Sequence, residues 1–317
     1  MHQIEMVNLN DLVSKDHVYR KILKFYPSDI IENGLKDIEH IKGSDGYGAS
    51  RLFKCLFIQF LEDLSDRELE RYLKENTAGK WFCDFKLLET TPTFTLFGKV
   101  RSRIGTKRLS RLFCTIRDAL KASGYMNEVL TFVDATHLIA KANLWKERDK
   151  AIKEKVASLN NDVLPKVAHD KQARIGCKGK EKFWYGYKEH VSVDMSSGLV
   201  NKVAITPGNI PDSSGLKNVC PSSGAVYADK GYCGKKAHKI ASRRMVHLRA
   251  ILKNNMKKKN KDLDRWVSGI RAPYERVFSK RSKRVRYIGV NKNQFSAFMQ
   301  ALVFNMKRLT VLPPNPA

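Results

Sequence analysis

Two aspartates and one glutamate have the surroundings expected of a metal-dependent site for phosphodiester chemistry. Asp134 and Asp229 each follow a short apolar run rich in β-forming residues, so we expect both at the ends of buried strands. Either aspartate alone would be an ordinary turn residue. Glu275, however, is one of three acids among twenty Lys and Arg in the segment 235–292. Because hard cations prefer carboxylate oxygens, the three residues predict a site for two divalent ions, Mg²⁺ or Mn²⁺.

Such a site would cut and join phosphodiester bonds without a covalent enzyme intermediate. Paired metal ions stabilise negative charge on the attacking and leaving oxygens and activate a water. A freed 3′-hydroxyl can then replace water as the nucleophile, which turns cutting into joining. A catalytic Tyr or Ser is not required, so Tyr187, Tyr227 and Tyr232 are interpreted as residues of the core or the site lining.

The first third of the chain predicts a helical domain. Apolar periodicity indicates a helix over Ala49–Leu64, and Ser65 with Glu68 has the capping-box form that starts the next helix. Further helices are expected over Thr93–Arg103 and Thr106–Ala122. We therefore predict a helix-turn-helix-like N-terminal DNA-binding domain over residues 1–124.

After Gly124 the pattern changes to strands, which predicts a mixed α+β catalytic domain over residues 125–317. A hairpin is expected from Tyr185–Val193 and Leu199–Thr206, followed later by a strand over His247–Leu252 and a last helix over Asn293–Leu309. The polar segment 138–183 lacks a clear period. It fits a long loop, a helical insertion or a mobile lid.

Net charge and cysteine usage restrict the partners. The formal net charge of +27 is typical of a protein that binds nucleic acid. No apolar run is long enough to span a membrane, and no export signal is visible, so we expect a cytoplasmic protein associated with the nucleoid. The six cysteines form no Cys-x-x-Cys pair, which favours reduced thiols. An alternative is a metal site built from Cys177, Cys220, Cys233 and His238.

Five motifs occur in the order TFVDATHL, FWYGYKEHVSVDMSSGLV, TPGNIPD, VYADKGY and RAPYERVF. Together with the helical first third they make the chain resemble, nearly end to end, the DDE transposases of bacterial insertion sequences, in the group formed by families five and four. The resemblance implies an RNase H-like core whose catalytic and metal-binding residues are Asp134, Asp229 and Glu275. It also implies end recognition by the N-terminal domain and homo-oligomers on double-stranded DNA that includes terminal inverted repeats and target.

The resemblance also assigns Arg271 to the family signature, four residues before Glu275. We interpret Arg271 as a clamp on a DNA phosphate near the start of a helix at about Pro273; an ion pair that only orients Glu275 is the alternative. Two departures weaken the phosphate-contacting role of this segment. Ser268 replaces the tyrosine of the wider group, and Ser282 replaces its lysine, with Lys280 and Lys283 close by.

Further basic side chains are candidates for DNA contact, although exposed cations are often only solvated. They are Lys99, Arg101 and Arg103 on the expected third helix, and Lys188 and His190 on one face of a strand. His137, Trp145 and Trp184 could contact metal or stack on a base, or could serve packing alone.

Two other functions fit parts of this pattern. One is a DNA-binding regulator descended from a transposase, which the three intact acidic residues disfavour. The other is an RNase H-like nuclease that cuts but does not join. Strand transfer would distinguish the transposase from both.

Overall fold

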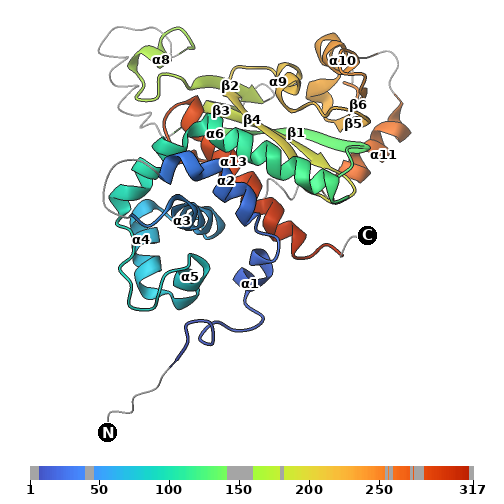
Figure 1. Ribbon diagram of the computed structural model, residues 1–317. Coiled ribbons are helices and arrows are strands. Elements are labelled where there is room, and N and C mark those ends of the chain that lie inside the picture. The colour runs from blue at the N-terminus through green and yellow to red at the C-terminus, as the bar shows by residue number, and fades with distance from the viewer. Residues whose placement is uncertain are drawn as a thin grey trace. The chain divides into compact units, whose positions relative to one another are not determined.

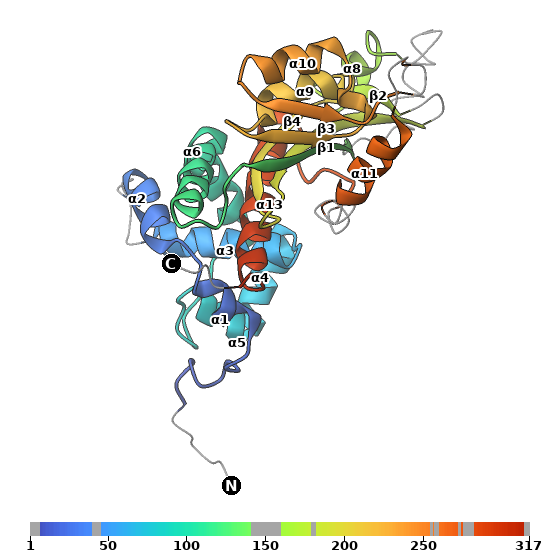
Figure 2. The same ribbon diagram turned by 90° about the vertical axis from the view of Figure 1, so that its right-hand side faces the viewer.

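A computed structural model describes residues 7–39, 46–140, 160–178, 182–253, 256, 260–271, 274 and 282–313 (Figures 1 and 2). The chain forms two compact units, unit 1 with Met1–Ala119 and Met299–Ala317, and unit 2 with Leu120–Phe298. The predicted division at residue 124 assigned residues 299–317 to the second domain, whereas compactness groups them with the first. The domain boundaries themselves stay a prediction.

Unit 1 contains only helices among its described residues, as the periodicity predicted. The capping box is present, because the Ser65 hydroxyl accepts the Glu68 N–H while the Glu68 carboxylate accepts the Ser65 N–H. The two helices predicted on either side of residue 105 form one element that is interrupted at Gly105, where φ is 66°. The helices are α1 (Val18–Leu23), α2 (Ser28–Glu39), α3 (Ala49–Leu61), α4 (Asp66–Glu75), α5 (Thr77–Phe82), α6 (Phe94–Ala122) and the last part of α13 (Val290–Leu309).

Aromatic side chains form the centre of unit 1. The rings of Phe57 in α3 and Phe82 in α5 stack with centroids 5.7 Å apart, and Tyr26 meets both edge-on. The Tyr19 hydroxyl donates to a Glu62 oxygen at 2.9 Å and lies 2.6 Å from the Tyr72 hydroxyl. Aromatic burial of this kind stabilises a small helical unit beyond the area that it removes from water.

Unit 2 is built on a mixed six-stranded sheet, which confirms the predicted fold class. The strand order is β2-β3-β1-β5-β6, and β4 also pairs with β3. The pairs β1–β5 and β5–β6 are parallel, whereas β3 runs antiparallel to β1, β2 and β4. The strands are β1 (Leu130–Ile139), β2 (Arg174–Lys178), β3 (Lys182–Asp194), β4 (Val200–Pro207), β5 (Ala225–Ala228) and β6 (His247–Ala250).

Helices lie on both faces of this sheet (Figure 2). On one face, α9 and α10 enclose an apolar core that includes Val133, Leu216 and Ala237. On the other face, α11 contacts β5. The helical elements of unit 2 are α8 (Leu164–Val167), α9 (Asp212–Val219), the 3₁₀ turn η1 (Lys230–Tyr232), α10 (Lys235–Ser242), α11 (Lys261–Arg271) and the first part of α13 (Val290–Leu309).

The segment 138–183, whose structure the sequence left open, contributes β2 to one edge of the sheet and the short helix α8. Asp170 connects this segment to β3 and to the residue before α13. Its buried carboxylate accepts the Tyr187 hydroxyl at 2.7 and 2.8 Å and the Gly289 N–H at 3.2 Å. Burial, with the hydrogen bond to Asp170, raises the pKa of Tyr187 far above its ordinary value. Residues 141–159, which include Trp145, lie outside the described chain.

Candidate active site

Strand register brings Asp134 and Asp229 together. Val133 in β1 pairs with Ala228 in the parallel strand β5, and the two aspartates are the next residue along each strand. Neighbouring strands lie about 4.8 Å apart, and residues in parallel register project to the same face. Both aspartates are partly exposed. The arrangement places two carboxylates side by side on the sheet face opposite the α9 and α10 core.

The strand context of Asp134 differs from the prediction. Asp229 directly follows β5, as expected, but β1 continues past Asp134 to Ile139. The extension forms because the long strand β3 pairs with β1 from Thr131 to Ile139, with Asp134 opposite Val191. Asp134 is therefore the first residue of β1 beyond its pairing with β5, and it is not the last residue of β1.

Each aspartate is oriented by the backbone that follows it. Asp134 Oδ1 accepts the Ala135 N–H at 2.7 Å, and Asp229 Oδ1 accepts the Lys230 N–H at 2.6 Å as the N-cap of η1. These local bonds hold each carboxylate close to its own strand. Carboxylate oxygens held in this way have the chemistry that a hard divalent cation requires.

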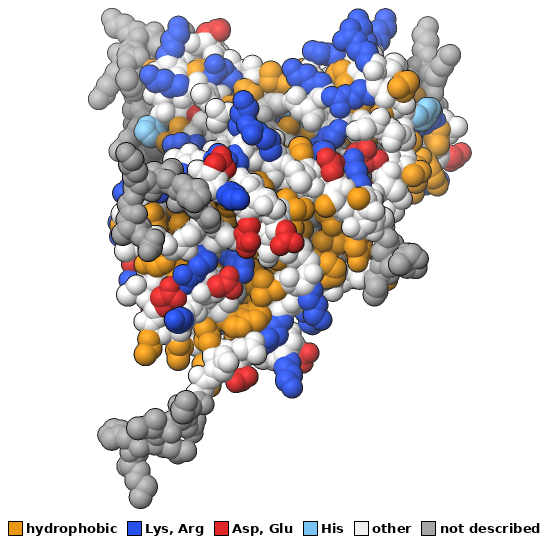
Figure 3. All heavy atoms as spheres, in the orientation of Figure 1, with side chains coloured by type: hydrophobic (Ala, Val, Ile, Leu, Met, Phe, Trp, Pro, Cys, Tyr) orange, Lys and Arg blue, Asp and Glu red, His pale blue; other side chains and the backbone are white. Residues whose placement is uncertain are grey.

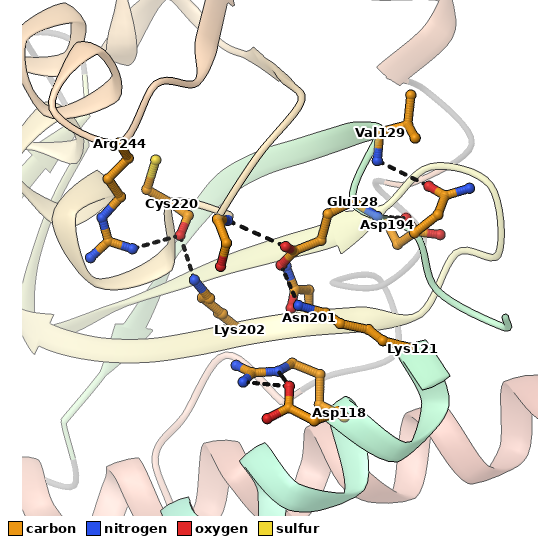
Figure 4. Close-up of polar contacts among 12 residues, drawn as sticks. Asp118, Lys121, Glu128, Val129, Asp194, Asn201, Lys202, Cys220 and Arg244 are labelled. Carbon is orange, nitrogen blue, oxygen red and sulfur yellow. Dashed lines mark hydrogen bonds and ion pairs between the residues drawn. The ribbon is translucent and has the colours of Figure 1, made fainter. Parts of the chain in front are cut away.

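The start of β1 is fixed by a buried carboxylate (Figure 4). Glu128 accepts hydrogen bonds from Asn201 and from the Ser222 N–H, and it pairs with Lys121 at 2.9 Å. Asp194 Oδ1 accepts the Glu128 N–H at 3.1 Å. Burial alone would raise the pKa of Glu128, but the contacts with Lys121 and Asn201 lower it below its ordinary value. The charged carboxylate thereby links β1 to β4 and to the loop before β5.

Aromatic contacts cover the same sheet face beside each aspartate. Phe132, two residues before Asp134, lies 6.1 Å from Tyr274 between ring centroids. Tyr227, two residues before Asp229, meets Trp266 of α11 at 5.7 Å in a T-shaped contact. Because alternate residues of a strand share a face, these rings lie on the face that carries the aspartates.

The rest of the predicted signature lies at the margin of the described chain. Glu275 and Lys280 are outside it. Arg271 is the last residue of α11, and its side chain is not described. Pro273, where a new helix was predicted to start, lies outside the described residues. Within the described ranges, no group of three or more His, Cys, Asp or Glu is arranged to hold a metal ion. Cys220 and Cys233 are buried, whereas Cys177 is exposed.

Lys188 and His190 share a face, as their spacing predicted, but α9 covers that face. Lys188 Nζ lies 2.8 Å from Asp212 Oδ1 at the start of α9. His190 is fully buried with Nε2 2.9 Å from Thr206 Oγ1, and its ring packs directly on Gly215. Burial lowers the pKa of His190 to about 4, Asp212 opposes this shift, and Lys188 adds to it. The prediction that His190 contacts DNA does not agree with a side chain that has no exposed surface.

Asp212 is a residue of this region to which the sequence analysis gave no role. It lies in the TPGNIPD motif, whose occurrence among the family-like motifs was the available signal. Its Oδ2 is so close to Gly231 that a Cβ added there would lie 2.8 Å from it. Asp212 thus connects β3, through Lys188, to the η1 turn that follows Asp229.

The basic residues predicted on the third helix differ in their surroundings. Arg101 forms a fork with Asp66, at 2.8 and 2.6 Å, and its side chain is 13% exposed. It joins α6 to the start of α4, so its charge is already satisfied within unit 1. Lys99 and Arg103 are exposed, as is Lys283, whose backbone carbonyl accepts the Ile139 N–H at 2.7 Å.

His137 and Trp184 pack on one another. Their ring centroids lie 5.2 Å apart, and the Trp184 indole N–H donates to the Tyr187 carbonyl at 3.2 Å. A Cβ added at Gly176 would lie 2.3 Å from the Trp184 ring, so β2 closes over the indole. These contacts support the packing interpretation of both residues over contact with metal or a base.

Comparison with known proteins gives two family matches. Residues 7–103 match a transposase domain (DUF772), and residues 126–306 match a transposase DDE domain. A solved structure, described as the cryo-EM structure of piggyBac transposase synaptic complex with hairpin DNA, has 11% sequence identity and a TM-score of 0.33. That match covers 80% of this chain and 52% of the other, so this chain spans about half of its length.

Helix hydropathy adds one observation. In the part of the chain that the structure describes, no helix is long and apolar enough to cross a membrane.

Proposed function

Because the chain belongs to the family of transposases with a DDE domain, we propose that it binds and cleaves the ends of its insertion sequence and joins the freed 3′ ends to target DNA. The observation that carries the proposal is the register of Val133 with Ala228, which sets Asp134 and Asp229 side by side. No other pair of acidic residues in the described chain combines in-register parallel strands with the family's motifs.

The proposed cofactor is a pair of divalent ions, Mg²⁺ or Mn²⁺, bound by Asp134, Asp229 and Glu275. Bound metal would stabilise charge on the attacking and leaving oxygens of the phosphodiester. The two described aspartates fit this role, because their strands and the bonds to Ala135 and Lys230 orient them before any ligand arrives. A preoriented carboxylate pair lowers the reorganisation needed at the moment of reaction.

Two aromatic contacts support Glu275 as the third carboxylate. Trp266 in α11 packs on Tyr227, and Tyr274 packs on Phe132, so the chain that leads into Glu275 touches the strand of each aspartate. The Tyr274 hydroxyl also donates to the Met195 carbonyl. Because Glu275 follows Tyr274 directly in the sequence, these contacts support its assignment to the same site as Asp134 and Asp229.

We assign binding of DNA backbone near the site to Arg271, Lys280 and Lys283, and recognition of the terminal repeats to unit 1. Arg271 remains the proposed phosphate clamp, since a guanidinium can grip a phosphate with two bonds. Lys99 and Arg103 are exposed and suit phosphate contact in unit 1, whereas Arg101 is engaged by Asp66. Pairing of two DNA ends by a homo-oligomer completes the proposal.

The test is cleavage of DNA that carries the element's ends. Asp134→Asn, Asp229→Asn and Glu275→Gln should each abolish cleavage and joining while end binding persists, because affinity comes mainly from phosphate contacts. Asp162→Asn is a matched control, since Asp162 is an exposed carboxylate before α8. Wild-type cleavage by any of the three variants would refute the corresponding assignment. Cleavage without strand transfer in the wild-type protein would instead identify a nuclease.

A further inference from the structure

A strongly basic segment of the chain begins immediately after Asp229. From Lys230 to Lys261 the sequence contains twelve Lys or Arg and no acidic residue. The described part of this segment comprises η1, α10, β6 and the start of α11. Figure 3 shows Lys and Arg side chains gathered over α10. None of the site residues assigned above comes from this helix.

The position of α10 is fixed by its apolar side. Ala237 and Ala241 are buried in the same core as Tyr232, which follows Asp229 in the η1 turn. A helix turns by 3.6 residues, so the side opposite these alanines faces outward. The outward side carries Lys235, Lys239 and Arg243, one turn apart, and all three are exposed.

These three cations form a straight row, which we call the α10 basic stripe. Neighbouring members are four residues apart, and the helical rise separates them by about 6 Å along the axis. Within the described residues none of the three forms an ion pair, unlike Lys188 or Arg101, whose charges are held by aspartates. The stripe therefore has three charges available to an external anion.

The topology sets the direction of the stripe relative to Asp229. In the parallel unit β5–α10–β6, the helix starts beside the end of β5 and runs back toward the start of β6. Lys235, the first member, is six residues beyond Asp229, and Arg243 caps the far end of the helix. A polyanion that lies along the stripe would thus run along α10, on the side of the sheet opposite the face that carries Asp134 and Asp229.

We propose that the α10 basic stripe binds the phosphate backbone of a DNA duplex on the side of the sheet away from the two aspartates, without reading its bases. Three flexible or forked cations in a row, with no acid within the segment, suit evenly spaced phosphates. This inference rests on the proposed function, since it assigns a surface to the same DNA substrate. It makes the stripe a binding surface that is separate from the carboxylates and takes no part in the chemical step.

The experiment measures how binding of the full-length protein to a short random-sequence duplex depends on salt. The variant Lys235→Gln/Lys239→Gln/Arg243→Gln should reduce the slope of log affinity against log salt by about 2 to 3, because each lost phosphate contact removes about 0.9. With the element's ends as substrate, more protein should be needed for cleavage, and the rate at saturating protein should stay at the wild-type level.

Two control variants distinguish an effect of the α10 basic stripe from a general effect of lowering the net charge. Lys166→Gln/Lys171→Gln/Lys178→Gln removes the same charge from exposed positions beside β2, at the opposite edge of the sheet, and should keep the wild-type slope. Lys235→Arg/Lys239→Arg/Arg243→Lys retains the charge and should also keep it. If the α10 glutamine variant still cleaves the element's ends and keeps the wild-type slope of log affinity against log salt, this inference is wrong and the proposed function still stands. Failure of the wild-type protein to cleave would overturn the proposed function.

Discussion

Tyr274 packs its ring on Phe132, 6.1 Å away between centroids, and Phe132 stands two residues before Asp134 on the same face of β1. This contact joins the chain just after α11 to the strand of the first aspartate. Tyr274 therefore packs against β1, a role that could not be predicted from its position in the RAPYERVF motif.

Tyr274→Ala should slow cleavage about tenfold or more and raise the Mg²⁺ concentration needed, because Glu275 loses the anchor beside it and small displacements of catalytic groups are costly. Tyr274→Phe keeps the ring contact and loses only the bond to the Met195 carbonyl, so it should retain most activity. Single-turnover cleavage over a series of Mg²⁺ concentrations measures both effects. Identical Mg²⁺ dependence in Tyr274→Ala and the wild-type protein would exclude a positioning role.

Gly231→Ala should reduce cleavage more than Gly234→Ala. A Cβ at position 231 would lie 2.8 Å from Asp212 Oδ2, and that carboxylate is held by Lys188, so the turn after Asp229 must shift. A Cβ at position 234 meets nothing within 4 Å. The comparison uses cleavage rates at saturating DNA, with thermal unfolding to verify that both variants fold. Equal rates in the two variants would show that this turn does not position Asp229.

Stability should fall as pH drops from about 6.5 to about 4, and His190 should account for part of the loss. Its pKa is lowered to about 4 by burial, so between these values the unfolded chain binds a proton that the folded chain does not. The buried neutral His190 therefore costs no unfolding free energy above pH 6.5. Below about pH 4 it lowers the unfolding free energy by on the order of 3 kcal/mol. Urea unfolding across this range should show a weaker pH dependence in His190→Gln.

His238→Gln is the matched control for that measurement, because His238 is exposed on α10. It should unfold with the wild-type pH dependence. If His190→Gln has the same pH dependence as the wild-type protein, the histidine is not desolvated in solution as it is in this fold.

Arg101 and Arg103 should differ in what they support. Arg101→Lys loses the fork to Asp66, so we expect a loss of about 1–3 kcal/mol of unfolding free energy. Arg103→Gln should leave stability unchanged and weaken binding of the element's ends in a salt-dependent way. Urea unfolding and binding titrations on the same two variants provide the comparison. A stable Arg101→Lys variant with weakened DNA binding would reverse the assignment.

Local pattern was sufficient to predict much of the architecture. The capping box at Ser65, the break near Gly105 and the hairpin around Gly198 follow from the backbone preferences of a few neighbouring residues, and all three are present. Asp134 and Asp229 were also readable, because an apolar β-rich run that ends in an acid is a local signal. Glu275 was proposed from its isolation among Lys and Arg, and the family-like motifs then supported that proposal.

Only the tertiary structure decided which neighbours these residues have. Register between β1 and β5 depends on pairing across about 95 intervening residues, and the extension of β1 past Asp134 depends on the length of β3. His190 and Lys188 were correctly placed on one face, but burial by α9 could not be read from alternation, which predicts two faces without saying what covers either. Arg101 is a second example. The sequence predicts a cation on a helix, but its ion pair with Asp66 forms only because α4 and α6 pack together.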